Sequence, residues 1–366
     1  MTSQVLFASA HVTRLDRDAT LPAKFERLLE KADLAPRFGG KRVAIKMHVG
    51  SGIGFYTIHP LFVRQVVDAV KKAGGSPFLT DGSFSTDAAV ARGYTPEVVG
   101  ARVVGAGGEH DRYYYTRKTE LEGLPEVEIC GNIADADALL VLSHGKGHGH
   151  TGFGGAIKNI GMGCVSYRTR GAIHGLMSGH FAWEEERCTH CEQCVHGCPT
   201  GAVRFNEQGQ LKISEHHCRY CMHCTRSCPT EALSMEQPGE KFRLFQAGMA
   251  AAVKEALAFF DPANVYYITL LMNITPLCDC WGFSTPPLVP DIGILASDDI
   301  VAIEQASLDL IDAEKLIPGT LPDQLCPPGE EGHLFQRIHG KDPYEQVCQC
   351  AAAGLGNSDY ALISVE

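Results

Sequence analysis

The most regular stretch of the chain is residues 188–229, and it divides the chain in two. It reads Cys188-Thr-His-Cys191-Glu-Gln-Cys194-Val-His-Gly-Cys198-Pro199 and then, after the spacer 200–217, Cys218-Arg-Tyr-Cys221-Met-His-Cys224-Thr-Arg-Ser-Cys228-Pro229. Both runs have the spacing Cys-x2-Cys-x2-Cys-x3-Cys-Pro. The proline that ends each run fixes φ and disfavours further helix, which turns the chain away. The stretch is therefore a duplicated unit.

This doubled spacing is that of bacterial ferredoxins, in which the fourth cysteine of each run ligates the cluster of the other run. It predicts two [4Fe-4S] clusters, one held by Cys188, Cys191, Cys194 and Cys228 and the other by Cys218, Cys221, Cys224 and Cys198. A single Cys-x2-Cys pair could instead bind zinc. Eight cysteines in a short secreted chain could form disulfides. Two complete copies of the run favour the clusters over both alternatives.

Length and composition restrict the class of protein. The 366 residues are 45% hydrophobic, enough for a large core and more than one domain. A net charge of -11 argues against a nucleic-acid or anionic-membrane partner. The chain has no apolar run of membrane-spanning length, and residues 1–4 do not start a basic segment followed by an apolar one. Because eight of fifteen cysteines are assigned to clusters, we expect a reducing, cytoplasmic location.

The flanks of the cysteine stretch alternate apolar runs with amphipathic segments. Strands are predicted at Gln4–Ser9, Arg42–Val49, Pro77–Thr80, Ala101–Val104, Ala138–Ser143, Asn264–Met272, Ile292–Ala296 and Tyr360–Val365. Helices are predicted at 20–34, 60–74, 242–260, 343–353 and from a cap at Ser297 or Asp298 to Asp312. This alternation predicts an α/β fold whose mixed or mostly parallel sheet is flanked by helices.

The simplest domain organisation is an insertion. Residues 1–181 and 238–366 would form one α/β domain, and residues 182–237 an inserted α+β ferredoxin-like module that binds both clusters. Insertions are tolerated at surface loops whose ends lie close together. Three domains in a row are the alternative.

A glycine-rich segment follows the strand that ends at Ser143. It reads His144-Gly-Lys146-Gly-His148-Gly-His150-Thr-Gly-Phe-Gly154-Gly155-Ala-Ile-Lys158-Asn159. Ligands of open α/β sheets bind beyond the carboxyl ends of strands. Lysines and glycines at a helix start near Gly155 could hold the phosphate of a flavin, the histidines could ligate a metal, or a lysine or histidine could act as acid or base on a carboxylate substrate. A solvated, flexible loop is the structural alternative.

Two further groups extend this candidate site. Cys278-Asp-Cys280 could supply two thiolates to an additional metal, although two small buried side chains in a turn are the alternative. Lys46, His48 and Asp81 end neighbouring strands and should lie at the same sheet edge. The remaining cysteines that we assign a structural role are Cys130, Cys326, Cys348 and Cys350.

Several of these runs together resemble the proteins of domain of unknown function 362, in the branch with an inserted double ferredoxin motif. The runs are Val43–Lys46, Ser143–His148, Gly152–Asn159, Cys278–Cys280 and Pro290–Ser297. The resemblance covers nearly the whole chain and implies a cytoplasmic iron-sulfur protein of an anaerobe, with no reaction attached. It marks as motif positions Lys46, His144, Lys146, His148, Lys158, Asn159, Cys278 and Cys280.

The sequence thus predicts an iron-sulfur redox protein whose ferredoxin-like module relays single electrons to a Gly/His/Lys-rich site. That site would hold an additional metal, a flavin or a small reducible substrate, and an oxidoreductase activity is a hypothesis. The candidate catalytic residues are His144, Lys146, His148 and Lys158, and the candidate cofactor-binding residues are Lys46, Gly154, Gly155 and Asn159. The alternative is a non-catalytic electron-transfer, cluster-delivery or metal-delivery protein that docks a redox partner protein.

Overall fold

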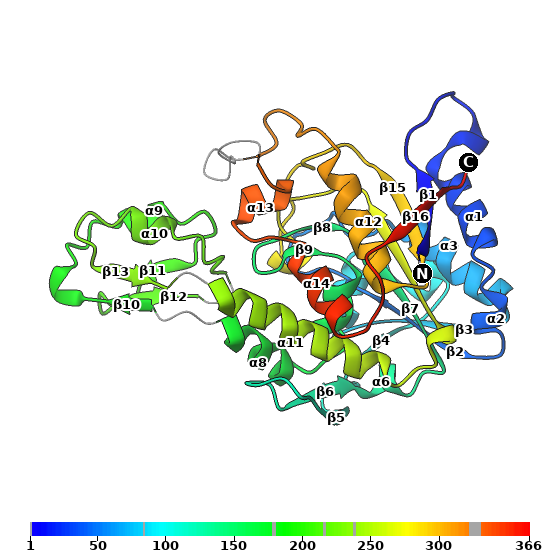
Figure 1. Ribbon diagram of the computed structural model, residues 1–366, viewed down its shortest axis with the longest axis horizontal. Helices are drawn as coiled ribbons and strands as arrows, with labels where there is room; N and C mark the ends of the chain where they lie inside the picture. The colour runs from blue at the N-terminus through cyan, green and yellow to red at the C-terminus, as the bar shows by residue number, and fades with distance from the viewer. Residues whose placement is uncertain (1, 83–84, 178–180, 215–216, 237–238, 322–330) are drawn as a thin grey trace.

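A large α/β body with a smaller lobe projecting from one end makes up the molecule (Figure 1). The computed structural model describes residues 2–82, 85–177, 181–214, 217–236, 239–321 and 331–366. The body is built on an eight-stranded sheet of order β16-β1-β15-β14-β7-β2-β3-β4. Its strands are β1 Ser3–Ser9, β2 Arg42–Met47, β3 Ser76–Asp81, β4 Val103–Gly105, β7 Ala138–His144, β14 Val265–Leu271, β15 Gly293–Ser297 and β16 Tyr360–Ser364.

The sheet is mixed but mostly parallel. β15 runs antiparallel to both of its neighbours, β1 and β14, whereas the other neighbouring pairs of the sheet are parallel. β7 and β14 are buried along their whole length, which explains why their sequences are continuous apolar runs. The predicted α/β fold is confirmed, and each of the eight predicted strands is present within a few residues.

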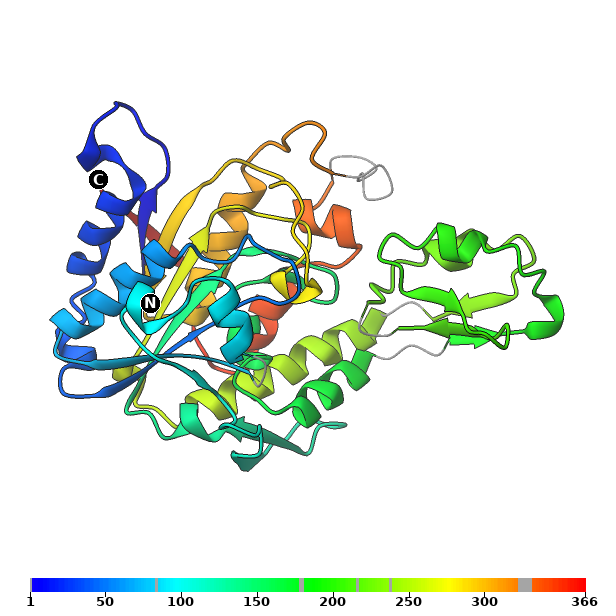
Figure 2. The same cartoon turned by 180° about the vertical axis from the view of Figure 1, so that it is seen from behind.

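Helices cover both faces of the sheet (Figures 1 and 2). Alternate residues of β7 serve separate cores: Leu139 and Val141 pack with helices α7, α11, α12 and α14, and Leu140 and Leu142 pack with α1 and α3. These helices span α1 Leu21–Lys31, α3 Pro60–Lys72, α7 Ala156–Gly161, α11 Gly239–Leu257, α12 Ile300–Asp312 and α14 Glu345–Ala352. No helix among the described residues has both the length and the apolar character needed to cross a membrane.

The cap of α12 differs from the predicted one. Asp299, not Ser297 or Asp298, caps the helix, and its Oδ1 accepts from the backbone N–H groups of residues 301 and 302 at 2.8 and 3.0 Å. Ser297 still belongs to β15, and the carboxylate of Asp298 pairs with Arg37 at 2.8 Å. The sequence placed three capping side chains in a row, and only the tertiary structure decides which of them meets the helix.

Several short elements were not predicted because their residues lack a clear period. They are the hairpin β5 Tyr114–Lys118 and β6 Glu126–Cys130, the helix α8 Tyr167–Met177, the pair β8 Lys146–His148 and β9 Gly152–Gly154, and the helical turns Arg17–Ala19, Ala35–Phe38, Ser85–Ala91, Pro96–Val99, Gly131–Ala134, Glu185–Arg187, Pro262–Asn264, Asp279–Trp281 and Leu334–His339. β5 is half-exposed to exposed, so it carries no apolar alternation.

The described residues of the lobe form two small antiparallel sheets and two short α-helices (Figure 2). Its elements are β10 Phe181–Trp183, α9 Gln193–His196, β11 Val203–Phe205, β12 Leu211–Ile213, α10 His223–Arg226 and β13 Leu233–Met235. β10 pairs with β13, so the segments that enter and leave the lobe lie side by side. An inserted segment needs this arrangement. The boundaries at 182 and 237 stay a prediction.

Candidate functional site

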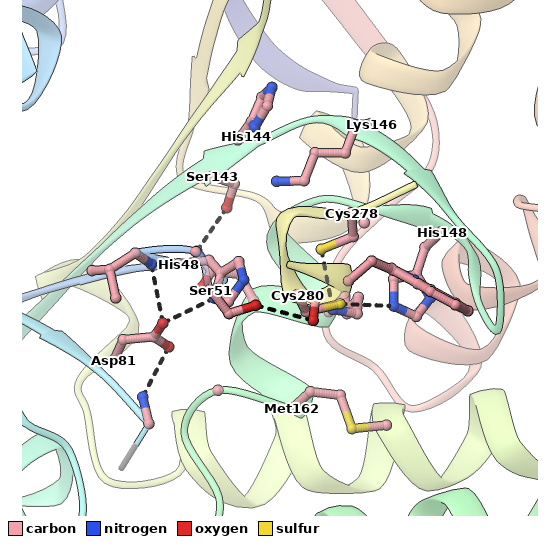
Figure 3. A pocket seen from close by; sticks show the side chains of 18 of the residues that line it. His48, Ser51, Asp81, Ser143, His144, Lys146, His148, Met162, Cys278 and Cys280 are labelled. Carbon is pink, nitrogen blue, oxygen red and sulfur yellow. Dashed lines mark hydrogen bonds and ion pairs between the residues drawn. The ribbon is translucent and has the colours of Figure 1, made fainter. Parts of the chain in front are cut away.

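A cavity of about 400 Å³ opens at the carboxyl ends of β2, β3 and β7 (Figure 3). Its wall is formed by the ends of these strands, by the glycine-rich segment after β7, and by the turn 278–281. Every residue predicted as catalytic or cofactor-binding, together with Cys278 and Cys280, lines this cavity. The predicted cluster ligands do not, because they belong to the lobe.

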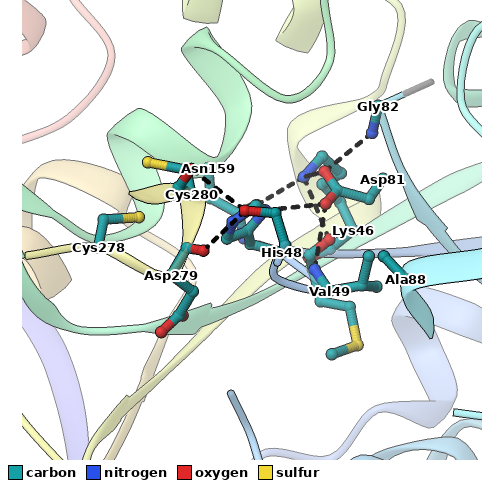
Figure 4. Close-up of polar contacts among 12 residues, drawn as sticks. Lys46, His48, Val49, Asp81, Gly82, Ala88, Asn159, Cys278, Asp279 and Cys280 are labelled. Atoms are coloured by element: carbon teal, nitrogen blue, oxygen red, sulfur yellow. Dashed lines mark hydrogen bonds and ion pairs between the residues drawn. The ribbon is translucent and has the colours of Figure 1, made fainter. Parts of the chain in front are cut away.

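Asp81, the last residue of β3, organises one side of the cavity (Figure 4). Its Oδ1 accepts from Lys46 Nζ at 2.9 Å and from Gly82 N at 2.8 Å. Its Oδ2 accepts from Val49 N at 3.1 Å and lies 2.9 Å from His48 Nδ1. Burial would raise the pKa of Asp81, but the charges of Lys46 and His48 outweigh it and hold that pKa far below its usual range. The expected meeting of Lys46, His48 and Asp81 at one sheet edge is confirmed.

The predicted cofactor residues Lys46 and Asn159 bond to each other. Lys46 Nζ donates to Asn159 Oδ1 at 2.7 Å, and Asn159 Nδ2 donates to the carbonyl of residue 142 at 3.0 Å. The Lys46 ammonium therefore has both a carboxylate and an amide oxygen as partners. At the other end of the Asp81 group, His48 Nε2 has no hydrogen-bond partner among the described residues.

A second buried carboxylate, Asp279, organises the opposite side. Lys146 Nζ lies 2.6 Å and His144 Nδ1 3.1 Å from Asp279 Oδ2, and all three residues are buried. His144 Nε2 lies 2.7 Å from the carbonyl of Met272. The charges of Lys146 and His144 outweigh burial and hold the pKa of Asp279 far below its usual range. Lys146 and His144, predicted as catalytic, thus anchor the residue between the two cysteines of the turn.

Cys278 and Cys280 lie on either side of Asp279 in this turn. Lys158 Nζ lies 3.7 Å from Cys278 Sγ. A hydrogen bond from Cys280 lowers the pKa of Cys278 well below its usual value, burial opposes this, and the Lys158 charge adds to the lowering. The same hydrogen bond, together with burial, raises the pKa of Cys280 well above its usual value. The sulfur whose pKa is lowered, that of Cys278, therefore faces the Lys158 ammonium group.

His148 completes this group, because its Nε2 lies 3.6 Å from Cys280 Sγ. Its Nδ1 accepts from the backbone N–H groups of His150 and Thr151 at 3.1 and 3.2 Å. Burial, and then the charge of Lys158, lowers the pKa of His148 well below its usual value, so the ring is neutral. A neutral ring that accepts at Nδ1 carries its proton on Nε2, which points that proton at Cys280. The alternative of solvated histidines is wrong, since His148 and His150 are each 3% exposed.

The start of α7 already has a hydrogen-bond partner within the protein. Glu304 Oε2 accepts from the backbone N–H of Ala156 at 2.7 Å, where an anion was expected. A Cβ on Gly155 would come within 2.5 Å of the same oxygen. Burial raises the pKa of Glu304 to about 8. The glycine at this position thus admits a carboxyl group of the protein itself, which sequence periodicity does not reveal. Gly154 lines the cavity.

The cysteine runs of the lobe share an unusual backbone conformation. Two equivalent positions within each run and one just after it have positive φ. The values are 52° and 53° at His190 and Tyr220, 57° and 64° at Glu192 and Met222, and, after the runs, 64° and 51° at Gly201 and Glu231. Because non-glycine residues rarely adopt positive φ, its recurrence at equal positions marks a repeated, tightly curved loop. In both loops the second residue after the first cysteine donates its N–H to that sulfur, at 3.5 Å to Cys188 and 3.4 Å to Cys218.

The fourth cysteine of each run lies near the other run. Burial raises the pKa of Cys194, and the nearness of Cys228 and Cys188 raises it further. Burial likewise raises the pKa of Cys224, with further contributions from the neighbouring thiols of Cys218, Cys221 and Cys198. Cys228 is thus grouped with the first run, and Cys198 with the second.

The loop of the second run packs against the wall of the cavity. Arg219, between the first two cysteines of that run, is 2% exposed, and its Nη2 donates to the carbonyl of Ile338 at 2.6 Å. Lys341 Nζ donates to the carbonyl of Arg219 and, at 3.0 Å, to that of Gly149 in the glycine-rich segment. A Cβ on Gly149 would lie 2.9 Å from Arg219 Cγ, so this glycine permits the close approach.

Aromatic rings continue this contact. Tyr220 lies next to Arg219, and its ring centroid is 6.2 Å from that of His150. Trp281, directly after Cys280, lies 6.2 Å from His150 and 5.7 Å from His217. The rings therefore form a continuous packed layer between the second cysteine run and the turn with Cys278 and Cys280. The spacing of these residues in the sequence gave no signal of this layer.

Two cysteine pairs outside the runs differ in their surroundings. Cys130 and Cys164 are buried, and the backbone N–H of Cys130 donates to the carbonyl of Cys164 at 2.8 Å. Cys348 and Cys350 lie on α14, one exposed and one buried. Cys326 lies outside the described residues.

The fold and the site define an α/β protein with a mixed eight-stranded sheet, a polar cavity at its strand ends and a cysteine-rich lobe. Residues 43–309 match the family described as Domain of unknown function (DUF362), and the chain belongs to this family, as its sequence motifs indicate. With fifteen cysteines, the chain has a composition consistent with metal binding.

Comparison with other known proteins adds little. None of the curated proteins matches the chain. Among solved structures, it is similar to the lactate racemase apoprotein from Thermoanaerobacterium thermosaccharolyticum, with 14% identity and a TM-score of 0.34. The match covers 68% of this chain and 49% of that one, so the chain spans about half the length of the racemase. A likeness this distant carries no argument about function.

Proposed function

We propose that the protein is an iron-sulfur redox protein whose lobe holds two [4Fe-4S] clusters and whose cavity receives their electrons. The first cluster would be held by Cys188, Cys191, Cys194 and Cys228, and the second by Cys218, Cys221, Cys224 and Cys198. A bound cluster supplies one-electron oxidation and reduction, at a potential set by hydrogen bonds to its sulfurs and by exposure.

The residues of the lobe fit such clusters. The six positive-φ positions curve each loop around its own cysteines, and backbone N–H groups point at cysteine sulfurs. Ala202 N donates to Cys198 Sγ at 3.2 Å. Burial raises the pKa values of Cys198 and Cys228, but hydrogen bonds outweigh it and lower both, chiefly from Thr200 at Cys198 and from the backbone of Leu233 and then Thr230 at Cys228. Donors of this kind stabilise thiolates, the form in which cysteine binds iron. The grouping of Cys228 with the first run supports the crossed ligand sets.

The observation that carries the proposal is the packing of the second run against the cavity. Arg219 and Lys341 hold this loop to the glycine-rich segment, and the ring layer of Tyr220, His150 and Trp281 fills the space up to Cys280. A carrier that served only an outside protein would not need one of its cluster loops buried against a polar cavity. The residues of this contact bind the loop of the second run to the body.

The first test is the composition of protein purified without oxygen. We expect about eight iron atoms per chain, four for each cluster, and spectra of reduced clusters by electron paramagnetic resonance. An iron content below about four atoms per chain, in protein whose eight lobe cysteines are chemically intact, would overturn the proposal.

The second test separates delivery to the cavity from simple electron transfer. Reduced protein is mixed with small reducible anions, and reoxidation of the clusters is followed by absorbance for the wild type, Lys158→Met and Arg204→Met. Lys158 lines the cavity, whereas Arg204 is an exposed residue of the lobe. We expect Lys158→Met alone to slow reoxidation. Equal rates in all three proteins, with rapid transfer only to a protein acceptor, would favour the docking alternative.

A further inference from the structure

We propose that Cys278 and Cys280 form a reversible dithiol–disulfide couple that collects two electrons in the cavity. This inference rests on the proposed function, in which the lobe would supply electrons one at a time. The two sulfurs and His148 Nε2 lie within 4.8 Å of one another, and both cysteines line the cavity. The ring layer lies between them and the second cysteine run, so they are the cysteines of the cavity on the side of the lobe.

The turn that carries the two sulfurs is held from several sides. Lys146 and His144 bind the side chain of Asp279, and Ser51 Oγ lies 3.2 Å from the carbonyls of Asp279 and Cys280. A fixed turn keeps the two thiols close in the reduced state, so that ring closure costs little conformational entropy. Flexible thiols of the same spacing would first have to be brought together.

The surrounding charges match the products of disulfide reduction. When the S–S bond breaks, two electrons enter, Cys278 becomes a thiolate opposite the Lys158 ammonium, and Cys280 takes up one proton beside His148. The donors would be the two [4Fe-4S] clusters proposed for the lobe, each of which supplies one electron when bound. In the reverse direction a two-electron oxidant, such as the diazene group of diamide, takes up the electron pair, Cys280 releases its proton to that oxidant, and the S–S bond forms again.

The same three side chains could be read as a metal site, and the hydrogen bonds of His148 argue against it. A metal at Nε2 needs the lone pair of that nitrogen, which moves the ring proton to Nδ1. Two backbone N–H groups already point at Nδ1, from His150 and Thr151. With a metal at Nε2, the ring N–H at Nδ1 would face the backbone N–H groups of His150 and Thr151, and none of these three donors would have an acceptor there. When Nε2–H donates to Cys280 instead, Nδ1 accepts from both backbone groups and each donor has a partner.

The chain contains a matched control for this couple. Cys348 and Cys350 have the same Cys-x-Cys spacing, but they lie two residues apart on helix α14, where side chains do not face each other. One is exposed and the other buried. We expect no couple at this pair under any conditions.

The first experiment counts free thiols. Holoprotein prepared without oxygen is treated with dithionite or with diamide. It is then quenched in acid, unfolded, alkylated and digested, and the mass of the peptide spanning 278–280 is measured by mass spectrometry. We expect this peptide to carry two alkyl groups after dithionite. After diamide it should carry none, and its mass should be lower by two hydrogens than that of the unalkylated dithiol peptide. The peptide spanning 348–350 should carry two groups in both states. Two groups on 278–280 in both states would overturn the proposal, as would a stoichiometric non-iron metal that is lost in Cys278→Ser/Cys280→Ser.

The second experiment counts electrons. Diamide-treated holoprotein titrated with dithionite should take up about four electrons per chain, one for each cluster and two for the disulfide. Cys278→Ser/Cys280→Ser should take up about two, and Cys348→Ser/Cys350→Ser about four. Equal uptake by wild type and Cys278→Ser/Cys280→Ser overturns the inference while leaving the clusters intact. Absence of iron overturns the proposed function, whereas the thiol count, which needs no variant, still decides whether the couple exists.

Discussion

Asp279→Asn should destabilise the protein more than most single changes. The substitution keeps the shape of the side chain but removes the charge that faces Lys146 Nζ at 2.6 Å and His144 at 3.1 Å. Lys146 is 2% exposed, so its ammonium group would stay buried without a carboxylate. Removing one member of a buried ion pair costs about 3–5 kcal/mol. Because asparagine still offers an oxygen, we expect about 3 kcal/mol, roughly a hundredfold in the unfolding equilibrium.

The measurement is urea unfolding of the holoprotein without oxygen, followed by circular dichroism. With a slope of about 3 kcal/mol/M, the midpoint should fall by about 1 M. The control is Glu30→Gln, which breaks a pair with Lys72 that is 3.1 Å long but exposed on both sides, and it should cost less than about 1 kcal/mol.

A double variant tests the cause of this loss. Asp279→Asn/Lys146→Met removes the stranded charge as well, and an apolar replacement of a buried pair is often close to neutral. It should therefore regain most of the lost stability. If the double variant is no more stable than Asp279→Asn alone, the uncompensated lysine is not the cause, and the reasoning is refuted.

Three other predictions concern separate parts of the molecule. Burial raises the pKa of Glu304 from 4.5 to about 8, so the contribution of this side chain to stability is full below pH 4.5 and is lost as the pH rises to about 8. The loss of unfolding free energy over this range is at most about 4–5 kcal/mol. Urea midpoints measured across the range should show this pH dependence in the wild type and lack it in Glu304→Gln. Cys198→Ser should remove the cluster of the second run, about four of eight irons, and loss of the first-run signal instead would contradict the crossed ligands. Lys158→Met should raise the pKa of Cys278 and slow its alkylation near neutral pH by about tenfold or more, measured by mass spectrometry, whereas an unchanged rate would mean that Lys158 does not stabilise the thiolate.

The strands of the sheet could be predicted because most of them are runs of several consecutive apolar residues, a pattern typical of buried strands. β7 and β14 are buried on both faces, which requires continuous apolar residues. The hairpin of β5 and β6 was missed because β5 is half-exposed to exposed and shows no alternation. The direction of β15 was also beyond the sequence, since an apolar run looks the same in parallel and antiparallel pairs.

By itself, the sequence determined the α/β class, the duplicated cysteine runs and the residues that gather at the strand ends. These follow from local patterns of polarity and spacing. Only the tertiary structure decided what each of those residues touches: Lys146 binds Asp279, Glu304 occupies the start of α7, and Cys278 faces Lys158. These partners lie far apart in the chain, so no local pattern links them. Their contacts arise only when the packed sheet brings its strand ends to one edge.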